Sequence, residues 1–302
     1  MESLLQWGLN LIRAIQTIAS PPLTFFMTLV TQLGTFQVYL IILCLVVWCV
    51  DEKKSVRLAL IVMVSSWINL ALKFFFLQPR PFWEGYDPGV GLVREQLGGL
   101  PSGHAQGSLV FWLGAASWFS RPWRYGLAAL VILLVSFSRI YLGVHFPTDV
   151  FAGWLIGGII YAAYFFLTPK IEKFLEHGGL RTALILSIAA SVVMILYLPS
   201  VVLLMPGAVV LGIGTGYALN KHVLGFRAAL VFGRRGTAKL LTLLGRFVLG
   251  MGGVLLVFFI CEKFLPAYRP FLFFRFALLG FWVYAGAPWL FLRIGLAERD
   301  TA

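Results

Sequence analysis

Residues 138–168 read SRIYLGVHFPTDVFAGWLIGGIIYAAYFFLT. The run from Val150 to Leu167 carries no charged residue and is close to the roughly 20 apolar residues that cross a bilayer as an α-helix. The residues just before it include Arg139, His145 and Asp149, and ionisable side chains at membrane depth are costly and usually functional. This stretch therefore predicts a helical membrane protein with a polar site at the entrance to a spanning helix.

The composition of the rest of the chain agrees with that prediction. Hydrophobic residues make up 60% of the 302 residues and charged residues 12%, whereas a soluble domain carries about 25% charged residues. A soluble fold is excluded, and the apolar runs predict an all-α polytopic transmembrane helical bundle of about nine spans. The predicted spans are residues 28–50, 56–77, 104–120, 123–141, 147–168, 182–204, 205–220, 238–260 and 272–294.

These runs divide the chain into three predicted parts. Residues 1–27 lack the basic start of a cleavable signal and predict an interfacial N-terminal helix. Residues 28–180 form a transmembrane core that holds the polar clusters, and residues 181–302 add further C-terminal transmembrane helices.

The formal net charge of +12 is a signal of membrane orientation. Most of the Lys and Arg residues fall in alternate short gaps between the predicted spans, which predicts a cytoplasmic C-terminus and an outer N-terminus. The expected location is an inner or plasma membrane, with the polar clusters on the periplasmic or lumenal side. The basic excess indicates membrane lipids and phosphorylated substrates as partners, and no nucleic acid is expected.

Three polar clusters fall on this outer side of the predicted topology. They combine cations, which suit a phosphate group, with a Ser-Gly pair that opens a helix and can offer a hydroxyl and a backbone N–H to an anion. Such groups form a cradle for an oxyanion that gains charge in the transition state. The predicted phosphate-binding residues are Lys73, Arg80, Ser102, Gly103 and Arg139.

Two histidines in these clusters divide the predicted chemistry. His145 and Asp149 are four residues apart, so the carboxylate can hold the imidazole in one tautomer and leave its other nitrogen free to attack phosphorus. His104 is the expected general acid for the leaving oxygen and then the base for water. No carboxylate pair or cysteine cluster suits a metal, so neither a metal nor another cofactor is predicted.

The spacing of these motifs resembles the type 2 phosphatidic acid phosphatase superfamily. The motifs are Lys, six residues, Arg-Pro; Pro-Ser-Gly-His; and Ser-Arg, five residues, His, three residues, Asp, within residues 56–165. The resemblance implies a catalytic core like that of this superfamily and of the haloperoxidases. It assigns phosphate binding, nucleophilic and acid roles to the residues already named. The nine spans and the outer N-terminus look like the glucose-6-phosphatase branch, but Asp149 is retained here, unlike in the animal glucose-6-phosphatases.

The predicted function is hydrolysis of a lipid phosphate or polyprenyl diphosphate through a phosphohistidine at the outer face. A site at the helix ends lets an acyl chain stay in the bilayer while its headgroup enters the cradle. A sugar-phosphate phosphatase, acting on a substrate such as glucose 6-phosphate, is the first alternative. A non-enzymatic anion or lipid transporter, a vanadate-dependent haloperoxidase and a transferase also remain open, as does the oligomeric state.

Overall fold

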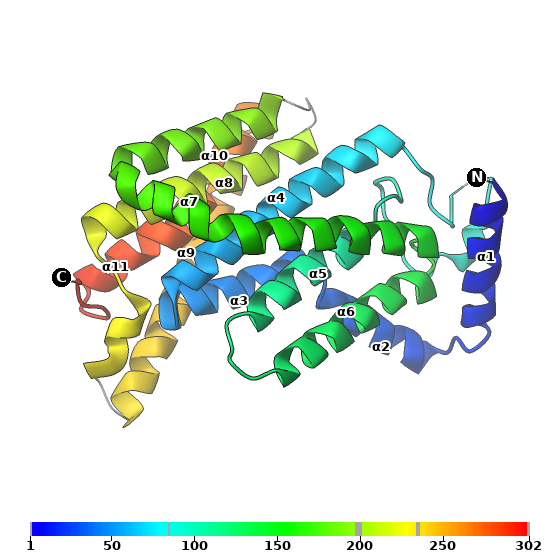
Figure 1. The fold of residues 1–302 in the computed structure, drawn as a ribbon, viewed down its shortest axis with the longest axis horizontal. Coiled ribbons are helices and arrows are strands. Elements are labelled where there is room, and N and C mark those ends of the chain that lie inside the picture. Colours follow the sequence, from blue (N-terminus) through cyan, green and yellow to red (C-terminus); the bar gives the residue numbers. More distant parts are fainter. Residues whose placement is uncertain (1, 84, 197–200, 234–235, 301–302) are drawn as a thin grey trace. The chain divides into compact units, whose positions relative to one another are not determined.

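The computed structural model describes residues 2–83, 85–196, 201–233 and 236–300, and most of these residues are helical (Figure 1). The predicted all-α class is confirmed. The main helices are α1 (Glu2–Gln16), α2 (Pro21–Gln32), α3 (Phe36–Cys49), α4 (Glu52–Phe76), α5 (Gly103–Ala116), α6 (Trp123–Tyr141), α7 (Pro147–Leu196), α8 (Val201–Leu219), α9 (Gly236–Phe264), α10 (Arg269–Phe281) and α11 (Ala287–Arg293). A short helical turn, η1 (Pro88–Val90), lies in the long connection between α4 and α5.

Fewer of the described helices qualify as candidate spans than the nine that the sequence predicts. Within the described residues, five helical stretches are long and apolar enough to cross a membrane, or six if α2 and α3, bent by 47°, form one span. Nine spans are therefore not confirmed. One reason is the length of α5, because its 14 residues rise only about 21 Å against an apolar bilayer thickness of about 30 Å.

Helix α7 explains another part of the difference. Its 50 residues contain the predicted span 147–168 and residues 182–196 of the predicted span 182–204, and the backbone breaks between them at Gly179, where φ is 61° and ψ is −159°. Glycine is the residue that accepts this left-handed φ without strain. The rest of the predicted span 182–204 comprises residues 197–200, which lie outside the described residues, and the start of α8, so the predicted boundary after residue 204 falls within α8.

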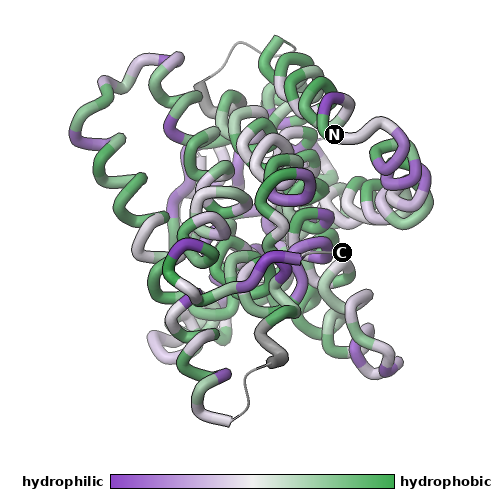
Figure 2. The backbone as a smooth tube through the Cα atoms, turned by 90° about the vertical axis from the view of Figure 1, so that its left-hand side faces the viewer, coloured by the Kyte–Doolittle hydropathy of each residue, from purple (hydrophilic) through white to green (hydrophobic). Residues whose placement is uncertain are grey.

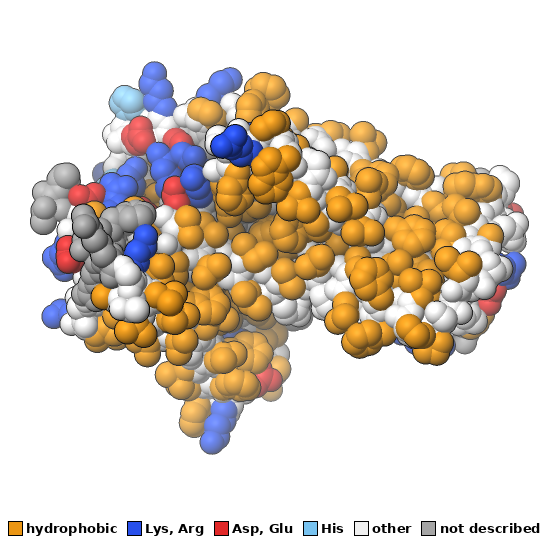
Figure 3. Space-filling model, turned by 90° about the horizontal axis from the view of Figure 1, so that it is seen from below, with side chains coloured by type: hydrophobic (Ala, Val, Ile, Leu, Met, Phe, Trp, Pro, Cys, Tyr) orange, Lys and Arg blue, Asp and Glu red, His pale blue; other side chains and the backbone are white. Residues whose placement is uncertain are grey.

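The surface is that of a membrane protein. Hydrophobic residues extend along most of the helices, and hydrophilic residues gather mainly at helix ends and connections (Figure 2). In Figure 3 hydrophobic side chains cover most of the visible surface, and the charged side chains are grouped in patches. Exposed side chains such as Phe166, Phe259 and Leu155 would be unfavourable in water. The chain is an integral membrane protein.

The structure divides into two compact units, which are described one at a time. The first unit comprises Met1–Tyr39 and Ile68–Phe165, and the second comprises Leu40–Trp67 and Phe166–Ala302. In the first unit α6 packs against α5 and α2, and α1 packs against α6 and η1. All eight residues predicted from the motifs to form the site lie in this first unit.

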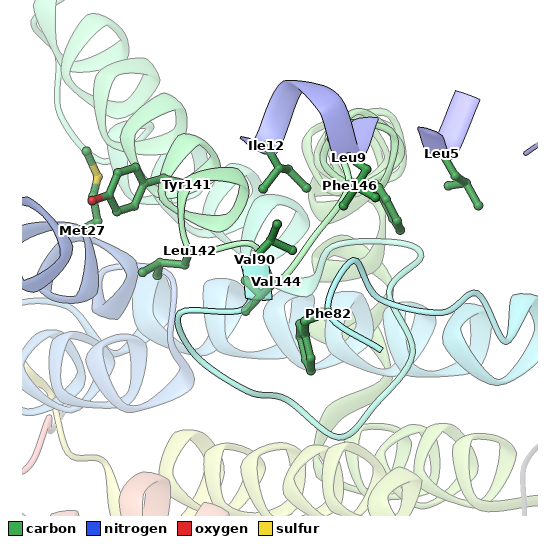
Figure 4. Packing of buried hydrophobic residues seen from close by; sticks show 10 residues of the cluster. All are labelled: Leu5, Leu9, Ile12, Met27, Phe82, Val90, Tyr141, Leu142, Val144 and Phe146. Carbon is green, nitrogen blue, oxygen red and sulfur yellow. The ribbon is translucent and has the colours of Figure 1, made fainter. Parts of the chain in front are cut away.

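A buried hydrophobic cluster in the first unit supports the connection between α6 and α7 (Figure 4). Leu9 and Ile12 of α1 are buried in this cluster together with Val144 and Phe146, the two neighbours of His145. A side chain on Gly8 would press on the Phe146 ring, with a Cβ 3.1 Å from its Cδ1. The N-terminal helix thus holds the His145 segment in place, and its position at a membrane interface stays a prediction.

The second unit is held by close helix packing and by a buried arginine. Glycines bring α8 and α10 together, because a Cβ on Gly212 would overlap the carbonyl oxygen of Ala277. Arg246 of α9 is fully buried, and its Nε donates to the carbonyl of Leu296 at 2.9 Å. Its Nη1 donates to the carbonyls of Trp48 at 3.0 Å and Ala228 at 3.1 Å.

Replacing Arg246 with alanine should therefore destabilise the second unit. The change leaves buried carbonyl groups without their donor, and we expect the free energy of unfolding to fall by about 3 kcal/mol. Thermal unfolding of the purified protein in detergent measures this loss. Arg293→Ala is the matched control, because Arg293 is exposed and lies over the ring of Trp289. Equal unfolding temperatures for wild type and Arg246→Ala would contradict the expectation.

Candidate active site

His145 and Asp149 form a direct pair at the start of α7. His145 Nδ1 lies 3.1 Å from Asp149 Oδ2, and the same oxygen accepts a hydrogen bond from the backbone N–H of Phe146 at 3.0 Å. The turn before them uses Gly143 at a φ of +67°, a conformation that suits glycine. Because the carboxylate can only accept, Nδ1 carries the proton and Nε2 keeps its lone pair.

The surroundings of His145 favour the neutral imidazole. Its side chain is 1% exposed, and burial lowers its pKa well below the ordinary value of 6.5. The nearby positive charges of Arg80, Lys73 and Arg139 lower the pKa further. His145 is therefore unprotonated at neutral pH, which is the state that a nucleophile requires.

Arg80 lies directly beside the unprotonated nitrogen of His145, which accepts a hydrogen bond from its guanidinium. It follows the end of α4, is 1% exposed, and has its Nη1 3.2 Å from His145 Nε2. The same Nη1 donates to the carbonyl of Val144 at 2.7 Å, and Nε donates to the carbonyl of Leu97 at 2.5 Å. These bonds fix the guanidinium plane next to the atom expected to attack phosphorus.

Arg139, in the last turn of α6, reaches the same place from another helix. Its Nη1 donates to Thr31 Oγ1 at 2.7 Å, and its Nη2 forms an ion pair with Glu95. Glu95 Oε2 also lies 2.7 Å from Arg80 Nη2, so one carboxylate joins both arginines. The Nε of Arg139 is buried and has no hydrogen-bond partner among the described residues, which leaves a donor available to a bound oxyanion.

Glu95 is ionised in this position. Burial raises the pKa of its carboxyl group, but the positive charges of Arg139 and Arg80 more than offset this and leave the pKa below its ordinary value of 4.5. The two guanidinium groups thus converge on one anionic group, because both arginines are buried and each forms a short ion pair with the Glu95 carboxylate.

Lys73 lies near the end of α4 and contacts the loop that precedes α5. Its Nζ donates to the carbonyl of Gly98 at 2.5 Å and to that of Gly99 at 3.0 Å. The loop segment that holds Arg80 through Leu97 thus also holds Lys73. Lys73 therefore belongs to the same cationic group, as the motif spacing predicts.

Ser102 and Gly103 are at the start of α5, where the sequence places them. The Ser102 hydroxyl oxygen accepts from the backbone N–H of Ala105 at 3.4 Å and so caps the helix, while the Ser102 backbone N–H donates to the Asp149 carbonyl at 2.9 Å. A Cβ on Gly103 would lie 3.0 Å from Asn69 Oδ1, so this backbone packs closely against α4. The helix start brings its positive end to the site.

His104, in the first turn of α5, is placed near the same charges. Its ring interacts electrostatically with Arg139, Glu95 and Arg80. Its Cδ2 lies 3.1 Å from where a Cβ on Gly34 would stand, so the bend between α2 and α3 packs against it. The structure thus gathers all eight predicted residues around one position, and their catalytic roles stay predictions.

Other side chains in the site have no motif that marks them. Gln78 Nε2 donates to Asp149 Oδ1 at 2.6 Å and so fixes the second oxygen of that carboxylate. Asn69 Nδ2 donates to Gln106 Oε1 at 2.9 Å beneath the start of α5. Glu95 lies in the only long outer connection of the predicted topology. The length of this connection indicates a functional loop, but it does not predict that Glu95 pairs with the two arginines.

The described residues contain no group of three or more His, Cys, Asp and Glu side chains arranged to hold a metal ion. The positive charges at the site come from Lys73, Arg80 and Arg139. These three cations are the groups that could neutralise a phosphate oxyanion.

Comparisons with known proteins identify relatives that are phosphatases. Glucose-6-phosphatase 3 of Rattus norvegicus is 32% identical over 225 residues, which cover 63% of this chain and 61% of the relative. Undecaprenyl-diphosphatase of Sulfolobus acidocaldarius is 34% identical over 128 residues, which cover 40% of this chain and 58% of the relative. The chain thus spans about three fifths of the length of these relatives.

A solved structure is also similar. It is that of a transmembrane PAP2 type phosphatidylglycerolphosphate phosphatase from Bacillus subtilis, with a TM-score of 0.49 and 25% sequence identity, covering 58% of this chain and 90% of that one. Among protein families, the model of the PAP2 superfamily matches residues 54–173. The model of the PAP2 superfamily phosphatase transmembrane extension matches residues 204–299. Both parts of the chain point to the same family, and the protein is an integral membrane member of the PAP2 superfamily.

Proposed function

We propose that this chain is a membrane phosphatase that acts through a phosphohistidine on His145. One observation carries the proposal: Arg80 and Arg139 converge on a single carboxylate, and Arg80 also lies beside the unprotonated Nε2 of His145. Two arginines that converge in this way match the geometry of phosphate oxygens. Similarity to two phosphatases supports the same activity.

The proposed reaction has two steps. His145 Nε2 forms a bond to phosphorus while the bond from phosphorus to the leaving oxygen breaks, which is the ester oxygen of a monophosphate or the bridging oxygen of a diphosphate, and His104 gives that oxygen a proton. In the second step His104 takes a proton from water, the water oxygen bonds to phosphorus, and the bond to Nε2 breaks to release phosphate. Asp149 holds the Nδ1 proton throughout, and the three cations stabilise the charge on the equatorial oxygens.

The proposed substrate is a lipid phosphate or a polyprenyl diphosphate at the outer face. The site lies at the ends of apolar helices, where a substrate chain can remain in the bilayer, and one relative is an undecaprenyl-diphosphatase. A sugar phosphate is the second candidate, because the similarity to glucose-6-phosphatase 3 covers a larger part of this chain.

A direct comparison of substrates separates these two candidates. Purified protein is supplied with phosphatidate or a polyprenyl diphosphate in mixed micelles, and separately with glucose 6-phosphate, and phosphate release is measured. We expect kcat/KM to be at least about 100-fold higher for the lipid, a difference of about 3 kcal/mol that a buried chain of a few methylene groups supplies. Equal kcat/KM values, or a higher value for the sugar, would contradict the lipid assignment.

The topology and the division of the chain belong to the same proposal. We place the site on the periplasmic or lumenal side and the C-terminus in the cytoplasm, on the bias of Lys and Arg toward alternate connections. Residues 1–27 are proposed as the interfacial part, 28–180 as the catalytic core and 181–302 as the additional transmembrane part. The reaction is proposed to need no metal, so activity that a chelator abolishes and an added metal restores would contradict it.

A non-enzymatic transporter is the rival from another class. It would use the same cations to bind an anion but would not need a nucleophile. Vesicle transport by a protein with His145 replaced, without phosphate release by the wild type, would favour the transporter.

A further inference from the structure

The carboxylate of Glu95 stands between the two arginines of the candidate site. Its Oε2 lies 2.7 Å from Arg80 Nη2, and its Oε1 is paired with Arg139 Nη2. The side chains of Arg80 and Arg139 are 1% and 3% exposed, whereas that of Glu95 is 30% exposed. A buried cationic pair thus has a partly exposed counter-ion from the connection between α4 and α5.

A carboxylate offers two charged acceptor oxygens to guanidinium groups, as a phosphate does, and each oxygen of Glu95 pairs with one of the two arginines. Glu95 therefore makes, from within the chain, contacts that the proposed function assigns to the substrate's phosphate. We propose that Glu95 is an internal occupant of the phosphate site, an autoinhibitory contact that phosphate must displace and that lowers the affinity of the site for phosphate-bearing ligands. The inference rests on the proposed function and adds a control on substrate affinity.

The residues that follow Glu95 show why it is held there. The Leu97 carbonyl accepts from Arg80 Nε at 2.5 Å, and the carbonyls of Gly98 and Gly99 accept from Lys73 Nζ. Segment 95–99 is thus anchored to the cations through its backbone. This anchoring keeps the Glu95 carboxylate at a high effective concentration beside the arginines.

Displacement requires movement of the glutamate side chain alone. Arg80 is fixed by the carbonyl of Val144 and Arg139 by Thr31 Oγ1, so both guanidinium groups stay in place when Glu95 leaves. A phosphate dianion brings more negative charge to the arginines than one carboxylate, and it can also use the buried Nε of Arg139. Phosphate can therefore replace Glu95, but its apparent affinity is reduced by the fraction of molecules in which Glu95 is bound.

The direction of the change in affinity distinguishes this role from a supporting one. If Glu95 competes with phosphate, removal of its charge strengthens phosphate binding. If Glu95 only orients Arg80 and Arg139, its removal leaves the arginines disordered and weakens binding. Damage to the fold also weakens binding, so a gain in affinity is specific to the competing role.

The test measures binding of inorganic phosphate to the purified full-length protein by titration calorimetry at constant pH and salt. We expect Glu95→Gln and Glu95→Ala to bind phosphate about tenfold more tightly than wild type, the change expected if Glu95 occupies the site about nine-tenths of the time. Asp87→Asn is the matched control, because Asp87 lies in the same connection and pairs with Arg13 at 2.8 Å. Its affinity should equal that of wild type.

Each other outcome overturns the inference in a recognisable way. Phosphate binding to wild type with equal or weaker binding to both Glu95 variants contradicts the competing role and leaves the proposed function intact. An equal gain in Asp87→Asn shows a general effect of loop charge and also overturns it. Failure of wild type and all variants to bind phosphate contradicts the proposed function together with this inference.

Discussion

Replacement of His145 with alanine should reduce phosphate release by at least about 10⁴-fold. The proposed reaction passes through a bond between Nε2 and phosphorus, and no other described side chain offers a free imidazole nitrogen both beside Arg80 and oriented by Asp149. In His145→Ala, water would have to attack phosphorus directly, and only the stabilisation of the transition state by the cations would remain. Release of phosphate from the preferred substrate is the measurement.

A matched histidine controls for this substitution. His177 of α7 is exposed, and its Nδ1 contacts the Lys173 carbonyl, so His177→Ala should keep wild-type activity. The thermal stability of His145→Ala should be compared with wild type, because the buried Asp149 carboxylate loses one partner. A folded His145→Ala protein that retains more than about one tenth of wild-type activity would contradict the nucleophile assignment.

Arg80→Lys should reduce kcat/KM by about 10² to 10³-fold although the charge is kept. The guanidinium of Arg80 contacts four groups from fixed directions: the carbonyls of Val144 and Leu97, the Glu95 carboxylate and the His145 ring. A lysine ammonium is a point charge and cannot reproduce the planar fork. The loss should therefore appear in kcat as well as in KM.

Arg94→Lys is the control for Arg80→Lys. Arg94 lies in the same connection, is exposed, and contacts the face of the Phe82 ring, with its Cζ 5.9 Å from the ring centroid. Its substitution should leave kcat/KM within about twofold of wild type, because exposed charges of this kind contribute little. Equal kinetics for wild type and Arg80→Lys would show that position 80 supplies only charge, contrary to the geometry.

Short-range features of the site could be predicted from the sequence. The pair His145 and Asp149 spans one turn at the start of a helix, so its contact follows from a spacing of four residues. Ser102 before Gly103 predicts a helix start, and Ser102 is indeed the N-cap of α5. These relations depend only on local geometry.

Long-range features could not be predicted in the same way. The contacts of Glu95 with two arginines join three distant parts of the chain, and an isolated acidic residue in a loop carries no periodic signal. The contact between Thr31 and Arg139 spans 108 positions and depends on how α2 packs against α6. Hydropathy also predicted nine spans, a number that the described helices do not confirm, since hydropathy does not detect the short length of α5.

The most direct test of the proposed chemistry is to trap the covalent intermediate. Wild-type protein is mixed with a substrate that carries radiolabelled phosphate, quenched in alkali within a turnover, and digested for peptide mapping. The proposed mechanism predicts label on the peptide that contains His145, stable to alkali, released by acid, and absent from His145→Ala. An active wild-type protein with label on another residue, or equal labelling of His145→Ala, would contradict it.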